Sequence, residues 1–104
     1  MVRDKVLILE DDDASRTQLV DIFRDQYKIL EATNEKQGVD ILRKHAASIV
    51  VILVNISIPA KNDFQVLQRL SKKKFCRQIP FMMITSEETS SYKKRGYEYG
   101  IVGY

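Results

Sequence analysis

The chain has 104 residues, of which 44% are hydrophobic, and this length and composition predict one globular domain with a single core. The longest apolar run, residues 49–54, is too short to cross a bilayer, and the N-terminus lacks a basic region followed by an apolar signal segment. We therefore expect a soluble, cytoplasmic protein without membrane association. The one cysteine, Cys76, excludes an internal disulfide.

The net charge of +3 is unevenly distributed along the chain. Residues 1–35 carry nine acids and five bases, whereas residues 36–104 carry five acids and twelve bases. The acids converge on residues 10–13, and the bases form runs at residues 69–77 and 93–95. Basic runs of this kind are usually solvated, and these runs show no regular alternation of aromatic and basic residues that would support base stacking. We do not expect this domain to bind nucleic acid.

Five short apolar runs, rich in β-branched residues, predict β-strands. They span residues 5–9, 27–31, 49–54, 81–84 and 101–104. The third run is apolar without interruption, which is typical of a strand covered by helices on both faces. Because the strands alternate with longer amphipathic segments, the predicted fold class is α/β, with βαβ units doubly wound into a five-stranded parallel sheet.

The amphipathic segments between the strands predict four helices. The first begins after Asp12 or Asp13 and the second after Thr33 or Asn34, because these residue types cap helix N-termini. The third precedes the fourth strand, and the fourth, residues 87–99, is mostly polar and is expected to be the most mobile element. The apolar stripes are Leu19, Ile22 and Phe23 in the first helix, Val39, Leu42 and Ala46 in the second, and Val66, Leu67 and Leu70 in the third.

Polar side chains stand at the carboxyl ends of the predicted strands. Glu10 and Asp11 follow the first strand, Asn55 the third and Thr85 the fourth, and the fifth ends at Tyr104. Ligands of parallel α/β sheets bind at this edge. Two carboxylates and an amide oxygen would form the all-oxygen pocket that Mg²⁺ prefers, with a hydroxyl beside it for an oxyanion. Alternatively the acidic run only caps a helix N-terminus, although one or two acids would suffice for that.

Four segments, in this order and spacing, resemble the receiver domain of bacterial response regulators. They are residues 7–12 (LILEDD), 15–16 (SR), 52–59 (ILVNISIP) and 79–86 (IPFMMITS), and the match is collinear over essentially the whole chain. The resemblance implies a flavodoxin-like sheet with strand order 2-1-3-4-5. It also implies a module of two-component signal transduction, or phosphorelay, that is not an enzyme. Its partners would be a histidine kinase, an output domain or another signalling protein.

The resemblance also implies roles for single residues. Glu10 and Asp11 match the acidic pair that holds Mg²⁺, and Ser57 matches the residue whose main-chain carbonyl helps to hold it. Thr85 matches the hydroxyl of the phosphorylation switch, and Tyr104 matches its aromatic residue.

Asn55 falls on the phosphorylated aspartate of the family, and here the sequence departs from the pattern. A neutral amide oxygen is a poor nucleophile compared with a carboxylate, so the usual aspartyl phosphate is not expected to form. We therefore expect a degenerate receiver, a pseudo-receiver. The missing negative charge also predicts that Mg²⁺ binding is weak or vestigial.

Two further departures concern the later part of the chain. Asn62-Asp63 stands where the family commonly has Asp-Gly, and the sequence ends at Tyr104, before the family's lysine and its fifth helix. A missing final helix would leave apolar surface beside the first helix. We expect a longer natural protein, the interpretation that we favour, or a partner subunit in a homodimer that covers this face.

Three functional hypotheses remain. In the first, the pseudo-receiver acts through protein–protein interaction. In the second, phosphorylation moves to Asp11 or Asp12. In the third, the chain is a small magnesium-dependent phosphatase with Asp11 as nucleophile, although 104 residues leave little room for a substrate pocket. Arg16 is expected to have a structural role, by packing on or pairing with the acidic start of the first helix.

Overall fold

The computed structural model describes residues 3–55, 72–74, 79–84 and 101–103. The elements among them are, in chain order, β1 (Lys5–Leu9), α1 (Asp13–Phe23), β2 (Lys28–Ala32), α2 (Glu35–His45), a 3-10 turn (Ala46–Ser48), β3 (Ile49–Asn55), β4 (Phe81–Ile84) and β5 (Ile101–Gly103). The third and fourth helices predicted from the sequence lie outside these residues.

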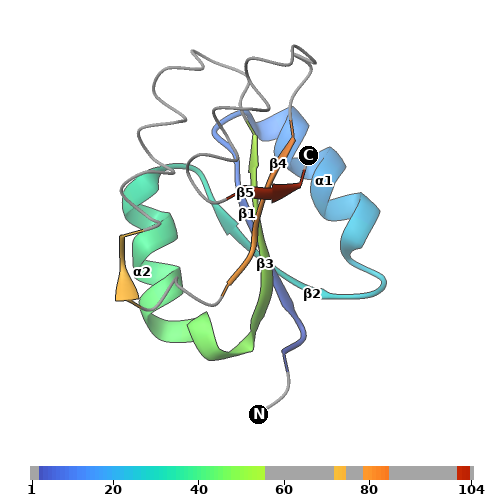
Figure 1. Ribbon diagram of the computed structural model, residues 1–104. Coiled ribbons are helices and arrows are strands. Elements are labelled where there is room, and N and C mark those ends of the chain that lie inside the picture. Colours follow the sequence, from blue (N-terminus) through green and yellow to red (C-terminus); the bar gives the residue numbers. More distant parts are fainter. Residues whose placement is uncertain (1–2, 56–71, 75–78, 85–100, 104) are drawn as a thin grey trace.

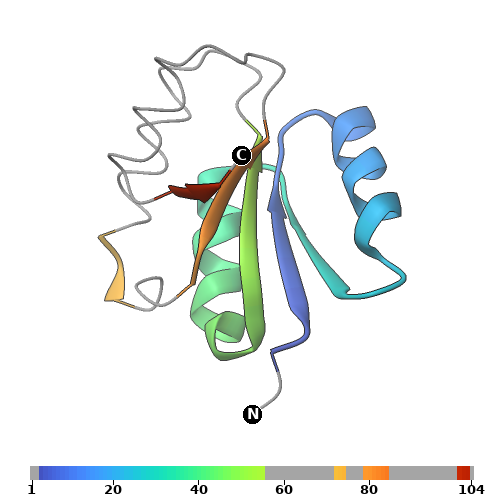
Figure 2. The same ribbon diagram turned by 45° about the vertical axis from the view of Figure 1, so that its right-hand side comes forward.

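The strands form one parallel sheet in the order β2-β1-β3-β4-β5. The predicted order 2-1-3-4 is confirmed, and β5 adjoins β4 through the pairs Phe81–Ile101 and Met82–Gly103. Helices α1 and α2 lie on opposite faces of the sheet (Figures 1 and 2), which is the doubly wound α/β arrangement. The expected lack of a final helix stays a prediction.

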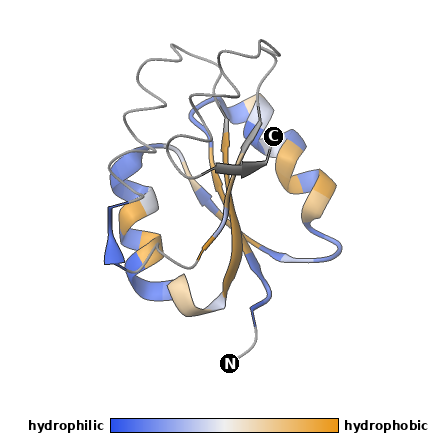
Figure 3. Ribbon diagram, viewed as in Figure 1, coloured by the Kyte–Doolittle hydropathy of each residue, from blue (hydrophilic) through white to orange (hydrophobic). Residues whose placement is uncertain are grey.

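The apolar sequence of β1 after Lys5 follows from this three-layer arrangement (Figure 3). Successive side chains of a strand point to opposite faces of the sheet. Val6 and Ile8 are buried in the cluster that includes Leu19 of α1, whereas Leu7 and Leu9 are buried in the cluster on the α2 face. Both faces of the strand are therefore apolar.

Helix α1 begins as predicted, but its buried face differs from the predicted stripe. Asp12 is the N-cap, and its side chain accepts a hydrogen bond from the Ser15 N–H. Leu19 is buried and Phe23 packs against the same cluster, whereas Ile22 is 65% exposed. The prediction for Ile22 was therefore wrong, because the helix turns its Leu19, Val20 and Phe23 side toward the sheet and Ile22 lies outside that contact.

Helix α2 matches its prediction closely. Asn34 is the N-cap and accepts a hydrogen bond from the Gln37 N–H at 2.9 Å. Leu42 is fully buried, and Val39 and Ala46 pack against the same cluster. Its first turn carries an acid and its last turn three basic residues, which suits the helix dipole.

Strand β2 starts one residue later than predicted, because the Tyr27 N–H donates to the Phe23 carbonyl at 3.0 Å and so belongs to the turn that ends α1.

Each of the two helices has 11 residues and is about 16 Å long at 1.5 Å per residue, whereas the hydrocarbon core of a bilayer is about 30 Å thick. In the part of the chain that the structure describes, neither helix could span a membrane.

Candidate functional site

Three neighbouring strands end at the same edge of the sheet. Leu9, the last residue of β1, pairs with Val54 of β3, and Asn55, the last residue of β3, pairs with Ile84 of β4. The register therefore aligns the carboxyl ends of β1, β3 and β4. The loop that follows β1 and the start of α1 form one side of this edge (Figure 1).

The structure brings part of the predicted site to this edge. Glu10 and Asp11 directly follow β1, and the main chain of Asn55 ends β3. The other predicted residues, Ser57 of the metal site and Thr85 and Tyr104 of the switch, lie outside the described residues. Their roles, and those of Glu10, Asp11 and Asn55, stay predictions.

Glu10 is the most buried charged residue of the described part of the chain. It is 2% exposed, its N–H donates to the Ala32 carbonyl of β2 at 3.0 Å, and its Oε1 accepts a hydrogen bond from the Asp12 N–H at 3.1 Å. The carboxyl group is thus held in place by the loop that it begins. Asp11, in contrast, is exposed to solvent.

The donor chemistry of this acidic pair fits a hard divalent cation, because Mg²⁺ binds carboxylate oxygens and usually keeps several waters. Two carboxylates alone are a partial ligand set. Within residues 3–55 and the short later segments that the structure describes, no group of three or more His, Cys, Asp or Glu side chains could hold a metal ion.

Asp12 has a different role from its neighbours. Its Oδ2 accepts the Ser15 N–H at 2.8 Å and so caps α1. This backbone hydrogen bond is the main cause that lowers the pKa of Asp12 below its ordinary value of 3.8, and the Ser15 side chain and the Arg16 charge lower the pKa further. The Asp12 carboxylate is therefore engaged in helix capping.

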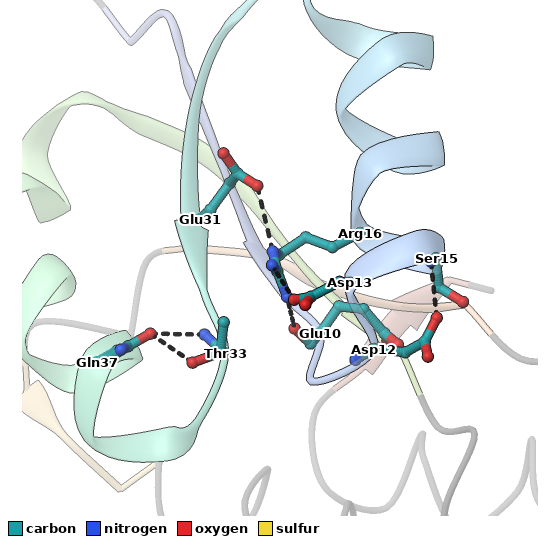
Figure 4. A network of polar contacts seen from close by, with 8 residues as sticks. All are labelled: Glu10, Asp12, Asp13, Ser15, Arg16, Glu31, Thr33 and Gln37. Atoms are coloured by element: carbon teal, nitrogen blue, oxygen red, sulfur yellow. Dashed lines mark hydrogen bonds and ion pairs between the residues drawn. The ribbon is translucent and has the colours of Figure 1, made fainter.

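Arg16 joins three segments around the acidic loop (Figure 4). Its Nη1 donates to the Glu10 carbonyl at 3.0 Å, its Nε to Glu31 Oε1 at 3.2 Å, and its Nη2 to Asp13 Oδ1. The Asp13 hydrogen bond and charge, followed by those of Glu31, raise the pKa of Arg16 above its ordinary value. The predicted pairing of Arg16 with the acidic start of α1 is confirmed.

Sequence reasoning missed one member of this network, Glu31. It lies 15 residues from Arg16 and becomes its neighbour only because β2 pairs with β1. The available signal was a single acid in a strand whose other charged residue is Lys28. The start of α2, which Figure 4 also shows, has a neutral counterpart, in which the Thr33 N–H and hydroxyl both donate to Gln37 Oε1 at 2.8 Å.

Comparisons with known proteins agree with this geometry. The solved structure of the chemotaxis response regulator CheY4 of Vibrio cholerae superposes with a TM-score of 0.83 at 20% identity, covering 98% of this chain and 84% of that one. At this identity the likeness concerns the fold. It supports a receiver-like fold for the sheet and helices described above.

Two curated relatives are similar in sequence. The response regulator GtcR of Aneurinibacillus migulanus is 26% identical over 98 residues, or 92% of this chain and 38% of GtcR. The transcriptional regulatory protein CiaR of Streptococcus pneumoniae is 27% identical over 100 residues, or 96% of this chain and 43% of CiaR. The chain thus spans less than half the length of both relatives.

The family model described as the response regulator receiver domain matches residues 6–104. This range includes every described strand except the first residue of β1, both described helices, and the aligned strand ends. The chain belongs to the response regulator receiver domain family.

Proposed function

We propose that the chain is a pseudo-receiver, a two-component signalling module that works through protein–protein interaction and does not form the usual aspartyl phosphate. The observation that carries the proposal is Asn55 at the end of β3, in register with Ile84 and one residue after the partner of Leu9. This is the strand end that faces the Glu10–Asp11 loop along the edge of the sheet. By resemblance to the family, Asn55 occupies the position of the aspartate that accepts the phosphoryl group.

The chemistry of the side chain supports this proposal. An aspartate attacks phosphorus with an anionic oxygen, whereas the oxygen of a carboxamide is neutral and its nitrogen lone pair is delocalised. Asn55 therefore lacks the nucleophile that phosphoryl transfer to this position needs. Phosphoryl transfer also needs electrostatic stabilisation by a cation, and the Glu10–Asp11 pair could still bind that cation.

The proposed cation site consists of the Glu10 and Asp11 carboxylates and the Ser57 carbonyl, with Mg²⁺ as the cation. Asn55 in place of an aspartate removes one negative charge from this pocket, so the attraction for Mg²⁺ falls. We expect Asn55→Asp to bind Mg²⁺ at least about tenfold more tightly than the wild type. Equal affinities of the two proteins in a calorimetric titration would contradict this weakened site.

Without an aspartyl phosphate, the signalling state is set by the protein that docks on the module. Thr85 and Tyr104 are the proposed switch residues that respond to docking. The partner is a histidine kinase, an output domain or another signalling protein, and a second copy in a homodimer is the further candidate. The module itself is proposed to have no enzymatic activity and to act in the cytoplasm.

Phosphodonor labelling tests the proposal directly. Wild type, Asn55→Asp and Asn55→Ala are incubated with acetyl phosphate and Mg²⁺, and each intact mass is measured. We expect no adduct on the wild type or on Asn55→Ala, and one added phosphoryl group on Asn55→Asp. A covalent adduct on the wild type that Asn55→Ala abolishes would refute the pseudo-receiver.

The same measurement covers the other hypotheses. An adduct on the wild type that persists in Asn55→Ala, and that peptide mapping assigns to Asp11 or Asp12, would mean phosphorylation beside the pocket. Asp12 is a poor acceptor in this structure because its carboxylate already accepts the Ser15 N–H. Turnover of a generic phosphate ester that Asp11→Asn abolishes would instead support a phosphatase.

A further inference from the structure

The Arg16 side chain is much less exposed to solvent than the two acidic side chains with which it forms ion pairs. Its side chain is 14% exposed, whereas those of Asp13 and Glu31 are 89% and 50% exposed. The guanidinium donates through three different nitrogens to three acceptors on the β1 end, the first turn of α1 and β2. A planar group with three fixed hydrogen bonds has a defined position and orientation.

Two hydrogen bonds restrain Glu10, one at its main chain and one at its side chain. Arg16 Nη1 holds the Glu10 carbonyl at 3.0 Å, and the Asp12 N–H holds Glu10 Oε1 at 3.1 Å. Asp12 is in turn fixed by the Ser15 N–H at 2.8 Å (Figure 4). Movement of the loop after β1 would therefore break the Arg16 contact and the Glu10 contact together.

These contacts give the acids near the end of β1 different roles. Asp13 and Glu31 are ion-paired to Arg16, and Asp12 caps the helix. The network thus draws three of the carboxylates near the strand end into structural contacts. Glu10 and Asp11 are the pair that the proposed function assigns to the cation.

We propose that Arg16 is a positioning residue of the cation site, which holds Glu10 in the place where its carboxylate, with that of Asp11, binds a divalent cation. This inference rests on the proposed cation site. Arg16 acts through the Glu10 main chain and is not a ligand itself, because a guanidinium has no lone pair to offer a metal. Residues that orient metal ligands in this way typically contribute about 10- to 100-fold to metal affinity.

Charge and positioning predict opposite effects when Arg16 is removed. Arg16→Met deletes a positive charge near the site, so electrostatics alone predicts tighter binding of a cation. Loss of positioning predicts weaker binding, because the Glu10 loop is no longer held. Arg16→Lys keeps the charge but cannot reproduce the planar fork to three acceptors, so it isolates the geometric effect.

The experiment uses Mn²⁺ as the probe and follows the electron paramagnetic resonance signal of the free ion in titrations of the full chain. We expect Arg16→Met to bind Mn²⁺ about tenfold more weakly than the wild type, and Arg16→Lys about fivefold more weakly. Arg24→Met is the matched control, because Arg24 follows the last turn of α1 and pairs with Asp21 at 3.4 Å, away from the loop. Its affinity should stay within about twofold of the wild type.

Equal or tighter Mn²⁺ binding by folded Arg16→Lys would overturn the proposal, and so would tighter binding by folded Arg16→Met. If Arg16→Met does not fold, Arg16→Lys decides. A second readout in the absence of metal is hydrogen exchange of the Asp12 amide, which donates to Glu10 Oε1. We expect faster exchange in Arg16→Lys and unchanged exchange in Arg24→Met.

The two readouts separate this inference from the proposed function. A wild type that binds no Mn²⁺ refutes the proposed cation site. In that case faster exchange of the Asp12 amide in Arg16→Lys still supports the positioning of Glu10 by Arg16, and unchanged exchange overturns it.

Discussion

The two faces of the sheet are stabilised differently. Among the described residues, nine buried hydrophobic residues form the cluster on the α2 face, and four form the cluster on the α1 face. Leu42 of α2 is fully buried, whereas the closest equivalent of α1, Leu19, is 9% exposed and Ile22 is 65% exposed. In the described part of the chain, the α2 face therefore has the larger buried apolar cluster, and α1 makes a smaller apolar contact with the sheet.

At the start of α1, where the described apolar cluster is smaller, the polar contacts include two ion pairs. The start of α1 is fixed by the Asp12 cap and by the Arg16 fork to Glu10, Asp13 and Glu31. Polar contacts are directional, so they define the position of single groups better than apolar packing does. A loop that must present acids at a defined place is suitably held in this way.

The largest expected effect on stability comes from truncating apolar side chains on each face of the sheet to alanine. Leu42→Ala should reduce the free energy of unfolding by about 3 kcal/mol, because it opens a cavity in the larger cluster. Leu19→Ala should cost less, and Ile22→Ala should change stability by less than about 0.5 kcal/mol, because the side chain is already exposed. Urea denaturation measures all three. Equal costs for Leu42→Ala and Leu19→Ala would remove the contrast between the faces.

A smaller effect is expected at the start of α2. Asn34→Ala removes the side-chain acceptor of the Gln37 N–H and should cost about 1 kcal/mol. Asn34→Ser is the control, since serine caps helices about as well as asparagine and should stay close to the wild type. Because α2 is also held by packing, its amides should remain protected from exchange in Asn34→Ala. Loss of protection throughout α2 would mean that the cap, and not the packing, holds this helix.

Gly38 tests how closely α2 approaches the sheet. An added Cβ would meet Leu9 Cδ1 at 3.7 Å and Ala32 Cβ at 3.9 Å, which are ordinary van der Waals distances. Glycine within a helix costs about 0.5–1 kcal/mol relative to alanine. Gly38→Ala should therefore raise the free energy of unfolding by about 0.5 kcal/mol in urea denaturation. A destabilised variant would show that the packing on this face has no room for one methyl group.

Most of the described fold was predictable because its signals are local. The apolar runs of β1 and β4 have the predicted bounds, and Asp12 and Asn34 are among the predicted caps. The burial of Ile22 was mispredicted because helical spacing shows which apolar residues lie on one side of a helix but not how many of them the sheet covers. Which of two neighbouring apolar positions meets the sheet depends on how the helix rotates in the fold.

The site was predictable to a lesser extent. Strand ends place Glu10, Asp11 and the Asn55 main chain at one edge, and this follows from parallel topology. The contact between Arg16 and Glu31 depends on the pairing of β1 with β2, so no local pattern contains it. Long-range polar contacts of this kind need the three-dimensional arrangement.

The smallest expected effect is a dependence of stability on pH through the Asp12 cap. The folded state lowers the pKa of Asp12 below 3.8, chiefly through the Ser15 N–H, so the carboxylate stabilises the folded state above this pH. The stabilisation is lost as the pH falls through the lower folded pKa. Asp12→Asn keeps a capping oxygen but does not titrate.

Urea denaturation of wild type and Asp12→Asn between pH 7 and pH 3 isolates this contribution. We expect the wild type to be the more stable at neutral pH, by a constant margin down to about pH 5, because a charged acid suits the helix N-terminus. The margin should shrink below pH 3.8. Asp4, whose pKa is lowered chiefly by its hydrogen bond with Lys5, titrates in the same range in both proteins and cancels in the difference. A margin that stays constant to pH 3 would mean that the Asp12 charge does not stabilise the start of α1, and that its hydrogen bond alone holds the helix there.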